Sequence, residues 1–182
     1  MKEHLIHIVE LCKKDDAKAQ KQLYEMYAPL FMSIAMRYMK NIEAAEDVMV
    51  MGFFKIFNNI KKFKGAGSFE GWMKRILVNE ALMQIRKHNN LHMTLELSEV
   101  DKADEASVIN DMAYEDLLAL LDELPPGYRT IFNMYVIEGY KHREIADLLD
   151  ISINTSKSQL ILAKKRMREL IKKKGFNQSM IS

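Results

Sequence analysis

Glu138-Gly-Tyr-Lys-His-Arg-Glu-Ile-Ala-Asp-Leu-Leu-Asp-Ile-Ser-Ile-Asn-Thr-Ser-Lys-Ser158 is the most informative segment of this chain. Apolar residues recur at helical spacing in residues 145–149, which predicts a short amphipathic helix. Asp150 follows where a tight turn is expected, because Asp tolerates a left-handed backbone better than most residues. Ser152 is a suitable N-cap for a second, longer helix. A short helix, a turn and a longer basic helix are the layout of a helix-turn-helix, which lays its second helix in the DNA major groove.

This second helix is predicted to bury one face and to turn the other outward. The residues expected to face inward are Ile153, Leu160, Ala163 and Met167. The outward face carries short polar and basic side chains, namely Thr155, Ser156, Lys157, Ser158, Gln159 and Lys164. Such side chains near a helix N-terminus can reach base edges or phosphates. The pattern favours DNA binding, with an ordinary helical hairpin as the alternative.

Composition excludes several classes of protein. The 182 residues are 48% hydrophobic, enough for one medium or two small cores. Cys12 is the single cysteine, so neither a disulfide framework nor a cysteine-based zinc site is expected. The five histidines have no clustered acidic or cysteine partners, so no metal and no cofactor is predicted. No apolar run approaches the roughly 18 residues of a membrane span, and the N-terminus lacks a signal-peptide layout. A cytoplasmic protein is therefore expected.

The formal net charge of +2 conceals a strong asymmetry along the chain. Residues 94–123 hold ten acidic residues against Lys102, whereas residues 153–182 hold eight basic residues against Glu169. A basic face attracts phosphates and releases counterions, which gives affinity for DNA of any sequence. Because the basic run continues directly from the helix-turn-helix, it indicates polyanion binding rather than only a solvated surface.

The remaining pattern predicts an all-α fold with two small helical domains. The first domain, residues 1–88, is expected to be a helical bundle with N-caps at Asp15 or Asp16, at Asn41 and at Ser68. Pro29 is expected to begin a new helix, because proline suits a first helical turn. An acidic linker is expected at residues 89–112. The second domain covers residues 113–176 and contains the helix-turn-helix, and a tail follows at residues 177–182.

The helix expected after Asn41 ends at the Gly65-Ala-Gly67 break, and its inward face is predicted to include Val48, Met51 and Phe54. The helix after Ser68 has Trp72, Ile76, Leu82 and Ile85 available for the core.

Several segments together resemble the extracytoplasmic-function (ECF) group of sigma factors. In the first domain they are Gln22-Leu-Tyr-Glu-Met-Tyr-Ala-Pro29, Ala45-Glu-Asp-Val48, Phe53-Phe-Lys-Ile-Phe57, Phe63-Lys-Gly-Ala-Gly-Ser-Phe-Glu-Gly-Trp-Met-Lys-Arg-Ile76 and Asn79. In the second they are Leu124-Pro-Pro-Gly-Tyr-Arg129, Glu138-Gly-Tyr140, Arg143-Glu-Ile-Ala146 and Thr155-Ser-Lys-Ser158. Each motif is weak alone. Two modules in this order, with an acidic spacer between them, are a specific match over nearly the whole chain.

The resemblance implies a dissociable promoter-recognition subunit of bacterial RNA polymerase. Its region 2, the first domain here, would bind the clamp of the large catalytic subunit and open the −10 element. Its region 4, the second domain, would bind the flap and read the −35 element. The acidic linker would thread through the polymerase cleft. Core RNA polymerase and promoter DNA are thus the expected partners, together with an anti-sigma factor that the sequence does not identify.

The residues expected at the −10 element are Phe63, Lys64, Phe69, Trp72 and Asn79. The resemblance points to Asn79, and an amide offers both donors and an acceptor to a base edge. Aromatic side chains beside lysines are suited to stacking on single-stranded bases. Phe63 and Phe69 are the better candidates for the DNA side, whereas Trp72 is expected to favour the core.

The residues expected to bind core polymerase are Glu46, Asp47 and Met51. The preference for acidic residues at a helix N-terminus explains the first two equally well. Relatives commonly carry Gln-Glu where this chain has Val50 and Met51. The contact is therefore either more apolar here, with methionine adapting to its partner, or made by other residues.

The residues expected to read the −35 element are Thr155, Ser156, Lys157, Ser158, Gln159, Leu162 and Lys164. Relatives often carry arginine in place of Gln159 and Leu162. Arginine favours guanine and glutamine favours adenine, so a different −35 preference is expected. Lys141 stands where relatives usually place a Ser or Thr cap.

Three other functions compete with this interpretation. A stand-alone helix-turn-helix transcription regulator would explain the second domain but leave the aromatic-rich first domain without a role. An enzyme is disfavoured, because no nucleophile–base pair, metal cluster or phosphate-binding glycine loop is recognisable. A helical protein-interaction domain with an incidental basic end is the third alternative.

Overall fold

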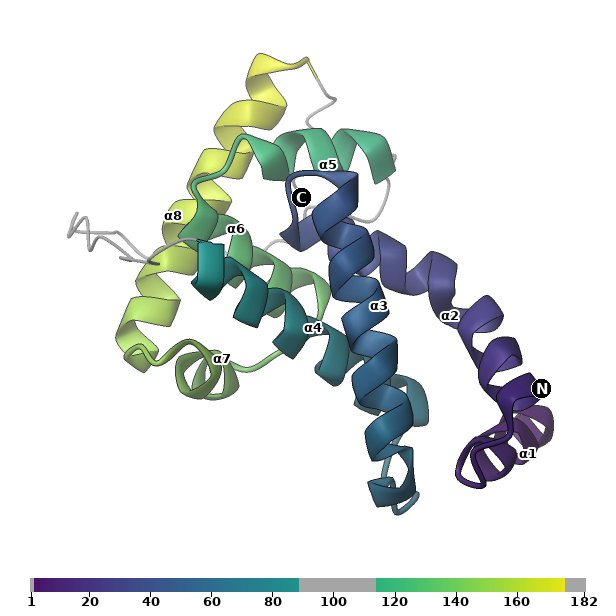
Figure 1. Ribbon diagram of the computed structural model, residues 1–182. Coiled ribbons are helices and arrows are strands. Elements are labelled where there is room, and N and C mark those ends of the chain that lie inside the picture. The colour runs from purple at the N-terminus through teal and green to yellow at the C-terminus, as the bar shows by residue number, and fades with distance from the viewer. Residues whose placement is uncertain (1, 89–113, 176–182) are drawn as a thin grey trace. The chain divides into compact units, whose positions relative to one another are not determined.

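The computed structural model describes residues 2–88 and 114–175, and every regular element in these ranges is helical (Figure 1). The chain divides into two compact units, Met1–His88 and Asn89–Ser182. The predicted all-α class and two-domain organisation are confirmed. The predicted linker at residues 89–112 and the tail at 177–182 lie outside the described residues. No helix in the described ranges is long and apolar enough to cross a membrane.

The first unit contains α1 (Lys2–Cys12), α2 (Ala17–Tyr38), α3 (Ile42–Asn59), the 3-10 turn η1 (Ile60–Lys62) and α4 (Phe69–His88). α3 packs against both α2 and α4, and α1 packs against α2. Three predicted N-caps are confirmed: Asp16, Asn41 and Ser68 accept backbone hydrogen bonds at 2.8, 2.8 and 3.2 Å. Each cap satisfies an N–H that the first helical turn would otherwise leave unpaired.

Pro29 lies inside α2 and does not begin a helix, which corrects the prediction. Proline removes a hydrogen bond and crowds the preceding turn, at a cost of about 3 kcal/mol or more in a helix interior. α2 continues because its residues on both sides of the proline are buried on one face, including Tyr27, Phe31 and Ile34. The rings of Tyr27 and Phe31 lie 6.0 Å apart and span the proline position. Tertiary packing thus overrides the local preference.

The buried face of α3 also differs from the predicted one. Met51 and Phe54 are predicted to face inward, yet they are 38% and 59% exposed. Gly52 marks the inner face, because a Cβ added there would lie 2.7 Å from Leu77 Cδ1 on α4. Val48 is buried as predicted. α3 is apolar around most of its circumference, so its periodicity allows two faces, and the close approach at Gly52 selects one.

The second unit contains α5 (Tyr114–Asp122), α6 (Pro126–Phe132), the π-helical turn η2 (Asn133–Ile137), α7 (His142–Leu149) and α8 (Ile153–Lys173). α8 packs against α5, α6 and α7. The buried Arg129 joins α6 to α5: its Nε donates to the Leu121 carbonyl at 2.7 Å, and its Nη2 lies 2.8 Å from Asp122 Oδ1.

The turn between α7 and α8 has the predicted geometry. Asp150 adopts a left-handed conformation, with φ 56° and ψ 50°. Ser152 caps α8 by accepting from the Thr155 N–H at 2.9 Å. The lysine side chain at the N-cap of α7 has no acceptor, and the Glu144 carboxylate instead accepts from the Lys141 N–H at 3.0 Å. The helix-turn-helix is therefore formed with a partial substitute for the usual Ser or Thr cap.

Candidate nucleic-acid interface

Three aromatic rings meet where the loop of residues 63–68 enters α4. The Phe63 centroid lies 5.1 Å from that of Phe69 and 5.5 Å from that of Trp72. Phe69 is only 8% exposed, so it offers less accessible surface to DNA than expected and packs mainly against the other two rings. Phe63 and Trp72 are half-buried and keep accessible ring surface. Phe63 and Trp72 are thus the more accessible of the three rings, and Phe63 and Phe69 both line the adjacent groove.

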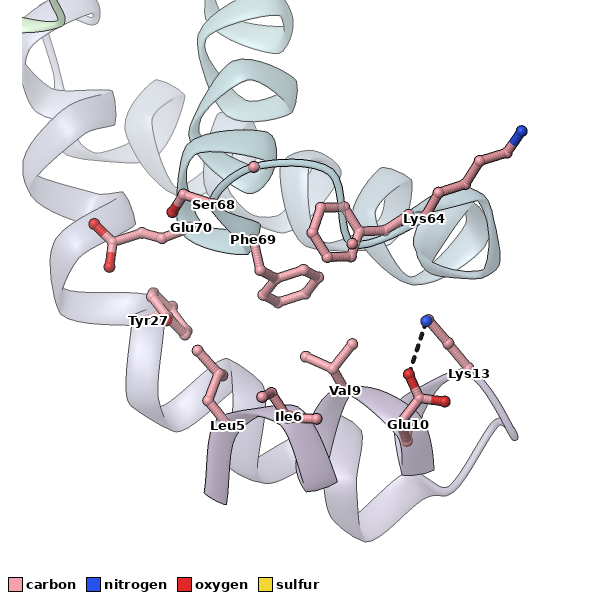
Figure 2. Close-up of a pocket in the computed structure, with 13 residues that line it drawn as sticks. Leu5, Ile6, Val9, Glu10, Lys13, Tyr27, Lys64, Ser68, Phe69 and Glu70 are labelled. Atoms are coloured by element: carbon pink, nitrogen blue, oxygen red, sulfur yellow. Dashed lines mark hydrogen bonds and ion pairs between the residues drawn. The ribbon is translucent and has the colours of Figure 1, made fainter. Parts of the chain in front are cut away.

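A groove of about 710 Å³ lies beside these rings. Figure 2 shows Phe69 across the groove from three apolar side chains of α1, Leu5, Ile6 and Val9. Glu10 on α1 and Lys13, the residue directly after this helix, form an ion pair of 2.8 Å at its edge. Lys64 projects from the loop side. The sequence does not single out the α1 wall, because no local pattern shows which helix packs beside residues 63–70.

Asn79 is exposed on α4. It follows Trp72 by seven residues, which is close to two helical turns, so both residues lie on one side of the helix about 10 Å apart along its axis. Lys64 is exposed, whereas Lys74 on α4 is held by Glu70 at 2.8 Å. The structure thus presents aromatic surface, an amide and a lysine along one region of the first unit.

α3 presents a separate row of exposed residues, here called the α3 row: Glu46, Asp47, Val50, Met51 and Phe54. Met83 on α4 is also exposed and lies beside Lys55, whose ammonium is 3.9 Å from Met83 Sδ. The same ammonium forms an ion pair with the fully buried Glu80 carboxylate. This ion pair links α3 to α4 at the edge of the row, one helical turn from Met51.

The first half of α8 exposes fewer side chains than predicted. Ser156 is fully buried and Gln159 is only 5% exposed, so neither is available to DNA as expected. The buried face is wider than one stripe because α6 and α7 both pack against α8. Ile153, predicted to face inward, is exposed. The predicted residues that remain accessible are Thr155, Lys157, Ser158, Leu162 and Lys164.

His142, which no sequence pattern singles out, connects three elements of the second unit. It is the first residue of α7, and its Nδ1 lies 2.9 Å from Ser156 Oγ on α8. Its ring stacks on Tyr135 of η2, with centroids 4.4 Å apart and an interplanar angle of 26°. Burial lowers the pKa of His142, and the positive charges of Lys157 and Lys164 lower it further. The imidazole is therefore neutral near pH 7.

A helical unit with exposed aromatic and amide groups, followed by a helix-turn-helix with a basic second helix, defines a nucleic-acid-binding protein of the transcription class. Residues 23–90 match Sigma-70 region 2, and residues 114–167 match Sigma-70, region 4. The chain is 30% identical over 142 residues to RNA polymerase sigma factor SigV of Bacillus subtilis (strain 168), covering 76% of this chain and 82% of that protein. The chain belongs to the ECF group of the sigma-70 family.

Two further similarities agree with this assignment. The chain is 27% identical over 158 residues to ECF RNA polymerase sigma factor SigE of Mycolicibacterium smegmatis, covering 84% of this chain but only 61% of that longer protein. A solved structure of the sigma factor RpoE with the anti-sigma factor NepR from Bartonella quintana shares the fold, with a TM-score of 0.56 and 22% identity. That match covers 84% of this chain and 96% of the RpoE chain.

Proposed function

We propose that this chain binds core RNA polymerase and directs it to promoters, reading the −35 element with the second unit and opening the −10 element with the first. The observation that carries the proposal is the presence of two different DNA-suited surfaces in one chain. One is an aromatic and amide surface on α4 and the loop before it, and the other is a helix-turn-helix. The names of its relatives, RNA polymerase sigma factors, support it. The role is one of binding and positioning rather than catalysis.

The α3 row is the proposed contact with core polymerase. Large exposed apolar side chains that form a patch mark interaction sites, and a polar rim around an apolar centre is the usual anatomy of a protein interface. Met51 and Phe54 supply the apolar centre, while Glu46 and Asp47 supply the rim. Val50 and Met51 replace the Gln-Glu that the family resemblance suggests, so the contact is more apolar than in such relatives.

The first unit is proposed to hold bases that have left the duplex. Stacking on an aromatic side chain contributes about 1–3 kcal/mol per base, and extruding a base costs a few kcal/mol. Stacking on Phe63 or Trp72 therefore offsets most of this cost, and the Asn79 amide adds hydrogen bonds to a base edge. The groove beside Phe69 leaves room next to the rings. Lys64 provides a nearby positive charge for the phosphates of the DNA backbone.

The second unit is proposed to bind duplex DNA through the exposed side of α8. Lys157 and Lys164 are suited to phosphate oxygens, which position a protein but carry no sequence information. Because Gln159 is buried, base reading falls to Ser158 and Leu162, whose side chains remain accessible. An apolar side chain can contact a thymine methyl group.

A stand-alone helix-turn-helix regulator remains the second candidate, but it gives no role to the α3 row or to the rings of the first unit. An anti-sigma factor is a further proposed partner, since the RpoE structure holds one. Because polymerase and promoter DNA are both in the cytoplasm, the protein is proposed to act there.

The function of Asn79 gives the sharpest test of −10 opening. Asn79→Ala removes an exposed amide, so binding to core polymerase should be unchanged. Open-complex formation should fall about fivefold or more, the size of a lost base contact of about 1–3 kcal/mol. Gln22→Ala on α2, another exposed amide, should leave both properties unchanged. Permanganate footprinting of the holoenzyme on a selected promoter measures opening. Equal opening by the two variants would remove Asn79 from the proposed site.

A further inference from the structure

We infer that His142 is a third phosphate-binding side chain of the helix-turn-helix, beside Lys157 and Lys164, and that it takes up a proton when duplex DNA binds. The inference rests on the proposed binding of duplex DNA by the second unit. It adds a residue of α7 and a dependence on pH to that function.

His142 lies beside the basic side of α8, which carries Lys157 and Lys164. Its half-buried ring is fixed by two contacts, the 2.9 Å approach to Ser156 Oγ and the stack on Tyr135. Lys157 directly follows Ser156, and both Lys157 and Lys164 lie close enough to act on the charge of the imidazole. The two lysines are seven residues apart and so share one side of α8. A phosphate bound by these lysines would therefore be close enough to the imidazole to interact with its charge.

The contact with Ser156 holds the ring in place in both protonation states. A serine hydroxyl is both a donor and an acceptor, and its hydrogen can rotate. When the imidazole is neutral with Nδ1 unprotonated, Ser156 donates to Nδ1, and Nε2–H is left as a donor. When the imidazole is protonated, Nδ1–H donates to Ser156 Oγ instead. The charge of His142 can change without releasing α8 from α7.

The charges around His142 set the sign of its response to DNA. In the free protein, burial and the two lysines disfavour the imidazolium, as does the N-terminus of α7, which carries a partial positive charge. On α7 itself, Lys141 and Arg143 are adjacent, and the nearby Glu144 carboxylate accepts from the Lys141 N–H. Tyr135 on η2 contributes the aromatic ring that stacks on the imidazole. A DNA phosphate is an anion, which favours the charged form of a nearby base.

Protonation and DNA binding therefore reinforce each other. The titration midpoint of His142 should be below 6.5 in the free protein and should rise when DNA binds. Between the two midpoints the complex holds more protons than the free protein. DNA affinity then increases as pH falls, by at most about tenfold for each pH unit in this window.

The test uses the full-length chain and a 20-base-pair duplex of random sequence at low salt, because a phosphate contact does not depend on sequence. The imidazole resonances are titrated by NMR with and without duplex, and His142→Gln assigns the signal. The expected result is an upward shift of the His142 midpoint with DNA. His142→Gln keeps a donor and an acceptor toward Ser156 but cannot titrate, so its affinity should lose the wild-type rise at low pH.

His7→Gln provides the matched control, because His7 is exposed on α1 in the other unit. This variant should keep the wild-type pH profile. If the duplex binds but the His142 midpoint stays in place, or if His142→Gln retains the full pH dependence, the inference about His142 is wrong and the proposed function stands. If the wild-type chain does not bind the duplex at all, the proposed DNA binding by α8 fails together with the inference.

Discussion

Gln159 shows how burial at a single residue changes the functional interpretation. Its side chain is 5% exposed, and its Oε1 has no hydrogen-bond partner among the described residues. A buried acceptor without a partner costs free energy, so this amide does not stabilise the helix-turn-helix through Oε1. Base discrimination by Gln159 would require α8 to leave its packing against α6 and α7.

We therefore predict that Gln159→Met leaves the −35 preference unchanged and leaves the stability of α8 unchanged or raised by up to about 1 kcal/mol. Hydrogen exchange of α8 amides measures the stability, and selection of holoenzyme-bound DNA from a random library measures the preference. Leu162→Ala, which alters an accessible side chain, should change the selected −35 bases. A changed preference in Gln159→Met together with an unchanged one in Leu162→Ala would contradict this account.

Residues whose structure depends on near neighbours could be predicted from the sequence. Asp150 adopts the left-handed turn and Ser152 caps α8, because both features involve contacts within four residues. The same holds for Asn41 and Ser68. The burial of Ser156 could not be predicted, since it contacts His142, which lies 14 positions earlier in the chain. The accessible part of the candidate −35 site is therefore smaller than the sequence indicates.

At the scale of helices, the sequence predicts where an element begins better than which face it buries. α2 passes through Pro29 because aromatic packing on both sides holds it together. α3 has two possible apolar faces, and only the close approach of Gly52 to Leu77 decides between them. From the sequence, Met51 is expected both in the core and at the polymerase contact. Because its side chain is exposed, only the polymerase contact remains available to it.

We predict that Met51→Ser weakens the binding of core polymerase about fivefold to tenfold, because interface residues that matter typically contribute more than 1 kcal/mol. Met26→Ser is the matched control, since Met26 is similarly exposed but lies on α2. It should leave polymerase affinity unchanged. Fluorescence anisotropy of labelled chain with core polymerase gives both values. If the two variants bind equally well, the α3 row is not the contact surface.

At the scale of the whole molecule, two helical units carry different DNA-suited surfaces. Phe63, Trp72 and Asn79 in the first unit are suited to unpaired bases, whereas α8 in the second carries basic side chains that are suited to a duplex. Neither unit accounts for promoter recognition by itself. A protein with both can locate a duplex element and hold an adjacent element open, provided that the polymerase keeps the two elements in register.

The central claim is that this chain confers promoter specificity on core polymerase. Single-run transcription of genomic fragments by core polymerase, with and without the purified chain, tests it most directly when the RNA start sites are mapped. The account predicts new start sites that appear only with the chain and share two sequence blocks at a fixed spacing upstream. Start sites identical to those of core polymerase alone, with no complex formed on size exclusion, would contradict it.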